Sequence, residues 1–362
     1  MNVNGVHYRS LWPNEDGKSI QIIDQTRLPL EFTILRLNNL ETVAQAIRSM
    51  QVRGAPLIGA IASYGIALTM RQRPTDAALE GACRVLGQSR PTAVNLRWAL
   101  ERMQKVLAPL APDARSEVSW REARAICEED VAINRAIGQH GLRLLLKLAQ
   151  EKRGTLHVMT HCNAGWLATV DYGTALAPIY LAHEAGAPVH VWVSETRPRN
   201  QGLLTAWELA QQGVAHTLIT DSACGHLLQR QQLDAVIVGA DRVTRRGDVA
   251  NKIGTYMKAL AARESEVPFY VASPGPSIDW TADDGMRDIP IEERSADEVR
   301  RVRGRGGSEE ISTVDIVPSS TPAANPSFDV TPARLVSALI TERGTCEASA
   351  HGLASLYPER IG

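Results

Sequence analysis

Apolar and polar residues follow different patterns in successive parts of this chain of 362 residues. Over about the first forty residues the two kinds alternate between turn signals, as in SIQIIDQTRLP and EFTILRL, which predicts short antiparallel strands. From Leu40 to about Gln150 apolar residues recur with i, i+3, i+4 spacing, which predicts helices. Pro56 stands where one helix begins, a position at which its missing N–H removes no hydrogen bond. The stretch 55–70 is largely apolar, which predicts a helix buried inside the protein.

The pattern changes after Gly154. Short runs that are apolar throughout alternate with helical stretches such as GTALAPIYLAHEAG and GLLTAWELAQQG. The runs cover residues 156–160, 189–193, 216–220, 235–239 and 269–273. This alternation is typical of a parallel sheet covered by helices on both faces. We therefore predict an α/β protein: residues 1–150 form a mostly helical domain with a few short N-terminal strands, and residues 151–362 form a doubly wound parallel-sheet domain.

Composition and charge narrow the class of protein. The chain has 39 Lys and Arg residues against 40 Asp and Glu, so it lacks the positive field of a general nucleic-acid or anionic-membrane binder. Its five cysteines are scattered and form no CxxC pair, which indicates free thiols in a reducing compartment. The N-terminal residues show no secretory signal, and the stretch 55–70 is shorter than a bilayer requires. We expect a cytoplasmic protein that binds neither nucleic acid nor membrane.

The first candidate for chemistry is Cys162, two residues beyond the run 156–160 in the segment HCNAG. Ligands of an open parallel sheet bind beyond the carboxyl ends of its strands, so this position is favoured for function. A cysteine near a cation or a helix N-terminus gains thiolate character, which is its reactive form, and the next helix is expected to begin near Gly173. The alternative is a buried structural thiol, the usual role of cysteine.

The second candidate is Asp241, which follows the apolar run 235–239. A carboxyl group that emerges from apolar surroundings has a raised pKa, because burial disfavours its charged form. Such a group can act as a general acid near neutral pH. The alternative is an aspartate that caps a turn or pairs with the adjacent Arg242.

Several basic residues stand where anions bind. Arg53 precedes the helix start at Pro56, and Arg90 has the same place before another helix. The first backbone N–H groups of a helix bind phosphate readily. Asn251 and Lys252 follow the strand of Asp241 by a short loop and add an amide and a charge. These positions, together with the loop that carries Arg197 and Arg199, indicate a phosphorylated small molecule as ligand.

Familiar nucleotide and metal motifs are absent from the sequence, including GxxxxGK[ST], GxGxxG after a strand and HExxH. His161-Cys162 and Cys224-x-His226 could ligate a metal, but no further ligands are spaced to complete a site, so we expect none. The Arg- and Gly-rich segment 300–310 could contact RNA. Because nothing around it is basic, we expect an exposed, mobile loop there.

The combination of motifs from residue 53 to residue 332 resembles one known family. The motifs occur in the order RGAPLIG, SRPTAVNL, NRAIGQHG, THCNAG, SETRPRNQG with TAWEL, VGADRV, GDVANKIGTY, IPIEERS and NPSFDVTP. They are similar to those of the methylthioribose-1-phosphate isomerases of methionine salvage. The same family includes ribose-1,5-bisphosphate isomerases and the regulatory alpha, beta and delta subunits of the translation-initiation exchange factor. In this resemblance, the presence of both Cys162 and Asp241 separates the isomerases from the non-catalytic subunits.

The resemblance implies a helical N-terminal domain, a Rossmann-like C-terminal domain without a dinucleotide, a homodimer and an aldose–ketose isomerase that needs no cofactor. The implied reaction converts S-methyl-5-thio-α-D-ribose 1-phosphate to S-methyl-5-thio-D-ribulose 1-phosphate. By the same resemblance, Cys162 and Asp241 are the catalytic residues. The implied substrate-binding residues are Arg53, Gly54, Ala55, Arg90, Gln201, Asn251 and Lys252. The Arg- and Gly-rich loop and the segment PGPSIDW differ from the sequences that are commoner in the family at these places.

The chemistry of this reaction explains the residue types. A phosphate on C1 prevents spontaneous ring opening, so the enzyme must protonate the ring oxygen while a hydrogen moves from C2 to C1. Asp241 suits the role of the acid that protonates the ring oxygen. Cys162 could stabilise the transition state or take the C2 proton. The sequence leaves open whether the hydrogen moves by hydride transfer or through an enolate. Two other functions also remain open. One is a ribose-1,5-bisphosphate isomerase, and the other is a non-catalytic regulatory subunit that binds a sugar phosphate.

Overall fold

The computed structural model describes residues 1–152, 154–307 and 310–360. Its first part contains the short antiparallel strands that the alternating pattern predicts. A small hairpin precedes a three-stranded sheet in the order β3-β4-β5. The strands are β1 (Asn2–Val3), β2 (Val6–His7), β3 (Leu11–Pro13), β4 (Ile20–Ile23) and β5 (Ile34–Leu37).

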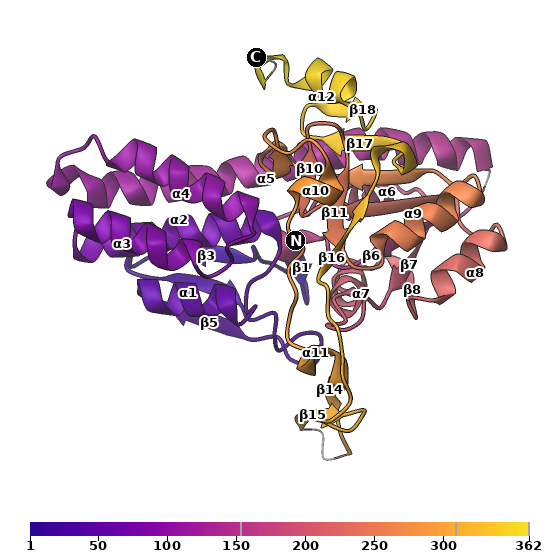
Figure 1. The fold of residues 1–362 in the computed structure, drawn as a ribbon, viewed down its shortest axis with the longest axis horizontal. Coiled ribbons are helices and arrows are strands. Elements are labelled where there is room, and N and C mark those ends of the chain that lie inside the picture. The colour runs from indigo at the N-terminus through magenta and orange to yellow at the C-terminus, as the bar shows by residue number, and fades with distance from the viewer. Residues whose placement is uncertain (153, 308–309, 361–362) are drawn as a thin grey trace.

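A helical layer follows these strands and confirms the second pattern. It is built around one helix, α2, which the other four contact and which is buried on nearly all sides. Its first turn contains Pro56, as expected. The helices are α1 (Leu40–Arg48), α2 (Ala55–Gln72), α3 (Asp76–Gly87), α4 (Val94–Leu107) and α5 (Pro112–Lys152). Helix α5 runs along most of the molecule and packs against α2 on one side and α6 (Ala177–Glu184) of the second part on the other (Figure 1).

The second part is built on a seven-stranded sheet in the order β18-β17-β12-β9-β6-β7-β8. All neighbouring pairs are parallel except the edge pair β17–β18. The strands are β6 (Leu156–His161), β7 (Val189–Ser194), β8 (Ala215–Ile219), β9 (Ala235–Gly239), β12 (Phe269–Ala272), β17 (Ala338–Thr341) and β18 (Gly344–Cys346). The five strands expected from the apolar runs are confirmed, whereas β17 and β18 were not predicted. The chain winds outward from β6 to β8 and then from β9 to β17, so the direction reverses between β6 and β9.

Helices pack against this sheet and along its ends. Besides α5 and α6 they include α7 (Gly202–Gln211), α8 (Ala223–Gln229) and α9 (Thr255–Glu264). Shorter helices occur later in the chain, namely α10 (Gly285–Asp288), α11 (Asp297–Arg300) and α12 (Ala350–Leu356). Among the described residues, no helix is long and apolar enough to cross a membrane.

A four-stranded sheet in the order β13-β10-β11-β16 was not predicted, and it carries part of the site. Its strands are β10 (Arg242–Thr244), β11 (Val249–Lys252), β13 (Ile278–Asp279) and β16 (Phe328–Thr331). Strands β10 and β11 pair antiparallel directly after Asp241, with Arg242 opposite Ala250. This pairing brings Asn251 and Lys252 back beside Asp241.

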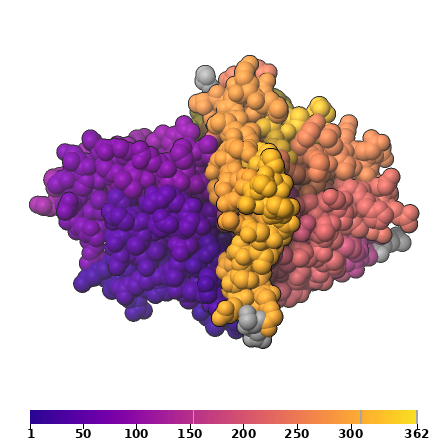
Figure 2. Space-filling model, turned by 60° about the horizontal axis from the view of Figure 1, so that its bottom comes forward, coloured from indigo at the N-terminus to yellow at the C-terminus, as the bar shows by residue number. Residues whose placement is uncertain are grey.

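The Arg- and Gly-rich segment was expected as a mobile loop, and that expectation is wrong. Residues Arg301–Arg305 form strand β14, which pairs antiparallel with β15 (Ile311–Asp315). The pairing is explained by the β-branched residues of ISTVD and by the ion pair between Arg301 and Asp315 across the two strands. Residues 308 and 309 of the predicted loop lie outside the described residues. In Figure 2 the chain around residue 300 forms a band between the N-terminal part and the residues of the large sheet.

Candidate active site

A cavity lies beyond the carboxyl ends of β6 and β9, where the winding of the sheet reverses. Open α/β sheets bind their ligands at this point because the connections leave opposite faces and open a crevice. The N-terminal part contributes the start of α2 and the loop before α4, and the second part contributes the loops after β6 and β9 and strand β11. The structure places on this cavity every site residue that the family resemblance implies: Arg53, Gly54, Ala55, Arg90, Cys162, Gln201, Asp241, Asn251 and Lys252.

Cys162 follows the last residue of β6 and has a left-handed backbone, with φ of 65°. Its N–H donates to Thr196 Oγ1 at 2.8 Å, and its carbonyl accepts from Thr205 Oγ1 at 2.8 Å. Side-chain hydrogen bonds on both sides therefore hold a backbone conformation that non-glycine residues rarely adopt.

The sequence left thiolate character open for Cys162, and the surroundings of its thiol disfavour that form. Burial raises its pKa, and the positive charges of Arg53 and Lys252 oppose that rise without cancelling it. The next α-helix, α6, begins at Ala177 and not near Gly173. A short 3₁₀ turn (Trp166–Ala168) comes between Cys162 and this helix.

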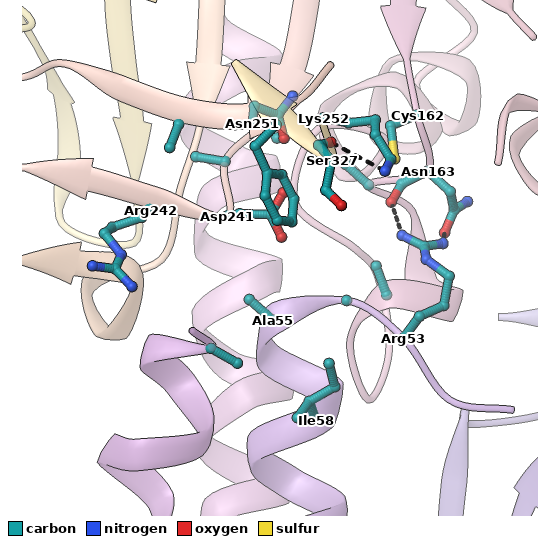
Figure 3. Close-up of a pocket in the computed structure, with 18 of the residues that line it drawn as sticks. Arg53, Ala55, Ile58, Cys162, Asn163, Asp241, Arg242, Asn251, Lys252 and Ser327 are labelled. Atoms are coloured by element: carbon teal, nitrogen blue, oxygen red, sulfur yellow. Dashed lines mark hydrogen bonds between the residues drawn. The ribbon is translucent and has the colours of Figure 1, made fainter. Parts of the chain in front are cut away.

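Asp241 lies across the cavity from Cys162 (Figure 3). Its N–H donates to Ala250 O at 3.0 Å, which ties it to strand β11. Burial raises the pKa of its carboxyl group, as predicted, while Lys252 and Arg90 oppose the rise. The alternative pairing with Arg242 is not formed, because that guanidinium turns away to Asp279 Oδ2, 3.1 Å distant. Asp241 is therefore available as a proton donor.

Arg53 is held by Asn163, the residue after Cys162. Two nitrogens of its guanidinium donate to Asn163, one to Oδ1 and one to the backbone carbonyl, both at 2.6 Å. The residue between Arg53 and α2 is Gly54, with φ of 96°, and a Cβ there would lie 2.3 Å from Ala168 O. Only glycine fits this close approach. Helix α2 then begins at Ala55, where its first backbone N–H groups lack partners within the helix.

Glu208 of α7 accepts a hydrogen bond from Asn163 and so holds it in place. Neither Glu208 nor Asn163 was identified as a site residue from the sequence. The Glu208 carboxylate is fully buried and accepts from Asn163 Nδ2 at 2.7 Å and from Tyr180 OH at 2.7 Å. It also accepts from the backbone N–H groups of Trp166 and Leu167. Because Asn163 donates to Glu208, its amide oxygen points toward Arg53. A charged residue inside the apolar helix GLLTAWELAQQG was the signal that could have identified Glu208.

Burial raises the pKa of Glu208, and its four hydrogen-bond donors oppose that rise. All four donors point at the two carboxylate oxygens, so a carboxylic proton would face another donor. The asparagine thus stands between a buried carboxylate and the guanidinium of Arg53. This bridge orients the arginine toward the cavity without neutralising it by direct contact.

Lys252 and Arg90 supply the other positive charges of the cavity. Lys252 Nζ donates to the backbone carbonyl of Ser327 at 3.1 Å and lies 5.4 Å from the centre of the Phe328 ring. Burial lowers the pKa of Lys252, while Cys162 and Asp241 oppose that change. Arg90 makes one long contact to Glu292 Oε2 at 3.4 Å, and its Nε has no hydrogen-bond partner.

Three further basic residues that the sequence singled out have other roles. Arg197 and Arg199 do not line the cavity: Arg197 donates to Val299 O, and Arg199 pairs with Glu298. His161 does line it, but burial lowers its pKa to about 3, and its Nε2 lies 2.8 Å from Ile253 O. His161 is therefore a neutral ring hydrogen-bonded to backbone and carries no charge for catalysis.

The charges of the cavity suit an anionic ligand. Arg53, Arg90 and Lys252 supply positive charge and are largely buried, and they face Cys162 and Asp241, whose pKa values are raised by burial. A surplus of buried positive charge beside a helix start is the setting in which phosphate groups bind. The arrangement can hold a phosphorylated molecule between the Asp241 carboxyl group and the Cys162 thiol.

Comparison with known proteins places this geometry in context. The model of the initiation factor 2 subunit family matches residues 51–348. The methylthioribose-1-phosphate isomerase of Rhodospirillum rubrum is 60% identical, with 99% of this chain and 94% of that protein covered. The protein of the same name from Gluconobacter oxydans is 58% identical over 99% of both chains.

Two solved structures share the fold. The crystal structure of 5-methylthioribose 1-phosphate isomerase from Pyrococcus horikoshii OT3 has a TM-score of 0.84 and 39% identity, covering 98% of this chain and 96% of that one. The structure of translation initiation factor eIF-2B subunit delta from A. fulgidus has a TM-score of 0.80 and 38% identity, covering 97% and 100%. These two structures share one fold but are named for different functions. The fold therefore does not decide between an isomerase and an initiation-factor subunit, and the residues of the site must.

Proposed function

The chain belongs to the initiation factor 2 subunit family, and we infer that within it this protein isomerises methylthioribose 1-phosphate. It converts S-methyl-5-thio-α-D-ribose 1-phosphate to S-methyl-5-thio-D-ribulose 1-phosphate, a step of methionine salvage. The observation that carries this conclusion is one cavity in which a carboxyl group with a raised pKa, Asp241, and a buried thiol, Cys162, face three buried basic side chains. The full-length identity with the isomerases supports the same substrate.

The proposed first step is ring opening. Protonated Asp241 donates its proton to the ring oxygen, and the bond between C1 and that oxygen breaks with its electrons going to the oxygen. Arg53, Arg90 and Lys252 hold the phosphate on C1, which stays bound throughout. A buried site with few competing waters strengthens each of these charge interactions.

The hydrogen then moves with its electron pair from C2 to C1 as the C2 hydroxyl becomes a ketone, and the proton of that hydroxyl passes to the Asp241 carboxylate, which restores the acid. Because burial raises the pKa of the Cys162 thiol, its basic thiolate form is disfavoured, which supports a direct hydride shift over an enolate. We expect the reaction in deuterium oxide to give a product that keeps the substrate's own hydrogen at C1, as read by mass spectrometry or NMR. Deuterium at C1 would instead indicate exchange through an enolate and would make Cys162 the candidate base.

The closest competing substrate is ribose 1,5-bisphosphate, which needs a second anion site where the other substrate carries a methylthio group. Besides its cations, the cavity is lined by Met50, Ile58, Ile289 and Phe328, which suit an apolar group. An assay with both substrates in one mixture tests the preference. Turnover of the bisphosphate alone would reassign the enzyme. Turnover of neither at high enzyme concentration would favour a regulatory subunit that binds a sugar phosphate.

Arg90→Ala is expected to raise KM by roughly ten- to 150-fold, the loss that corresponds to one charge-assisted hydrogen bond to phosphate. Arg90 tests this better than Arg53, because removal of Arg53 would also leave Asn163 without its two contacts. Steady-state kinetics measures the effect, and Arg143→Ala on the exposed face of α5 is the matched control. An Arg90→Ala protein that melts early but keeps the parental KM would give Arg90 a structural role instead.

The assembly and location are proposals of the same kind. The family resemblance supports a homodimer, and helix α9 exposes Met257 and Leu260, which lie one turn apart. Light scattering coupled to size exclusion tests the homodimer, and a monomer at micromolar concentration contradicts it.

The cysteines are all unpaired in the structure, which supports a reducing compartment such as the cytoplasm. Fractionation of cells that produce the protein tests the location.

A further inference from the structure

Buried polar side-chain atoms that lack a hydrogen-bond partner are rare in folded proteins, and those that line a cavity point to a ligand. Among the described residues, three such atoms belong to side chains that line the candidate cavity. They are Arg90 Nε, Gln201 Oε1 and Ser327 Oγ. Arg90 and Gln201 are already expected to bind substrate. The same criterion marks Ser327, which neither the sequence analysis nor the family resemblance had identified.

The backbone of Ser327 is fixed while its hydroxyl group is not. Its N–H donates to Glu292 O at 2.9 Å, and its carbonyl accepts from Ile253 N at 3.0 Å and from Lys252 Nζ at 3.1 Å. The residue is 1% exposed. In Figure 3 its hydroxyl points into the cavity, between Asp241 and Asn163.

We propose that Ser327 is a further substrate-binding residue, whose hydroxyl group donates a hydrogen bond to an oxygen of the sugar phosphate beside Lys252. This inference rests on the proposed function. Lys252 bonds the carbonyl of the same residue, so an anionic or hydroxyl oxygen drawn to the ammonium group comes next to the hydroxyl. In the free protein this hydroxyl is desolvated without a partner, and the ligand supplies one.

This arrangement predicts opposite effects of Ser327→Ala on binding and on stability. Removal of an unpartnered buried hydroxyl leaves the melting temperature of the free protein unchanged or higher. The same change raises KM by on the order of ten-fold, because the bound oxygen loses a hydrogen-bond donor. A merely structural serine would not show this combination.

Thr331→Val is the matched control. Thr331 Oγ1 is also buried without a hydrogen-bond partner and lies on the adjoining strand β16, but it does not line the cavity. We expect Thr331→Val to keep the parental KM. A rise in KM as large as that of Ser327→Ala would mean that any change in this strand disturbs the site, and would overturn the proposal.

The experiment compares the parent protein, Ser327→Ala and Thr331→Val. For each it measures KM for methylthioribose 1-phosphate, competitive inhibition by inorganic phosphate, and thermal unfolding of the free protein. Weaker inhibition by phosphate in Ser327→Ala together with a raised KM supports a bond to a phosphate oxygen. A raised KM with unchanged phosphate inhibition supports a bond to a sugar oxygen. If KM and phosphate inhibition are both unchanged in Ser327→Ala while the parent protein turns over the substrate, the proposal is wrong. If the parent protein has no turnover, the proposed function fails, and unchanged phosphate binding by Ser327→Ala then rejects the phosphate contact separately.

Discussion

Asp241→Asn is expected to lower kcat for methylthioribose 1-phosphate by at least a factor of about 10²–10⁴, the usual contribution of general acid catalysis. Asparagine keeps the shape of the side chain and a hydrogen-bond donor, but it cannot release a proton to the ring oxygen. The effect should fall on kcat more than on KM, because the phosphate-binding residues are unchanged. Steady-state kinetics with purified protein measures both.

The fold should survive this substitution, because the amide has the shape of the carboxyl group and adds no unpaired charge to the site. Thermal unfolding checks this point. In the parent protein, kcat should decline as the pH rises through the raised pKa of Asp241, since only the protonated form can donate. Asp241→Asn should lack that alkaline decline. A variant with near-normal kcat would remove Asp241 from the chemistry.

Cys162→Ser is expected to lower kcat by roughly 10²–10³, the loss seen when one group that stabilises a transition state is removed. The serine hydroxyl is smaller and less polarisable than the thiol, so its contact with the migrating hydrogen differs. The backbone bonds to Thr196 and Thr205 should remain, because they involve the main chain of residue 162. Kinetics and thermal unfolding together separate a chemical effect from a folding defect.

Cys83→Ser on helix α3 is the control for this substitution, because that half-buried thiol does not line the cavity. We expect its kcat to match that of the parent protein. Cys162→Ser with parental kcat and KM would contradict the catalytic role of the thiol and would leave Asp241 acting with another partner.

Much of the fold was predictable because its elements are encoded over short distances. The helical spacing of residues 40–150 and the apolar runs after Gly154 reflect contacts between residues close in the chain. Strands β10, β11 and β16 were missed because each is four residues or shorter and is stabilised by pairing with segments distant in sequence. The hairpin of β14 and β15 pairs locally and was missed for another reason, because the Arg and Gly residues of β14 are typical of a loop.

The contacts that hold the site residues in place were not predictable, because they join residues that are distant in the sequence. Arg53 and Asn163 lie 110 positions apart, and the carbonyl of Ser327 meets Lys252 across 75 positions. Glu208 can be seen as unusual in sequence, but its link to Arg53 through Asn163 exists only once α7 packs below the loop after β6. The family motifs contain all of these residues without indicating which ones touch.

The sequence by itself determined where Cys162 and Asp241 would lie, because an apolar run forms a buried strand and delivers the next residues to its carboxyl edge. The raised pKa of Asp241 also followed from the apolar run before it, but only the tertiary structure decided the state of the Cys162 thiol. Burial raises the pKa of this thiol, and burial is a property of the whole packed molecule rather than of neighbouring residues in the chain. Thiolate character is disfavoured at Cys162 because desolvation outweighs the field of Arg53 and Lys252, a balance set by residues from both halves of the protein.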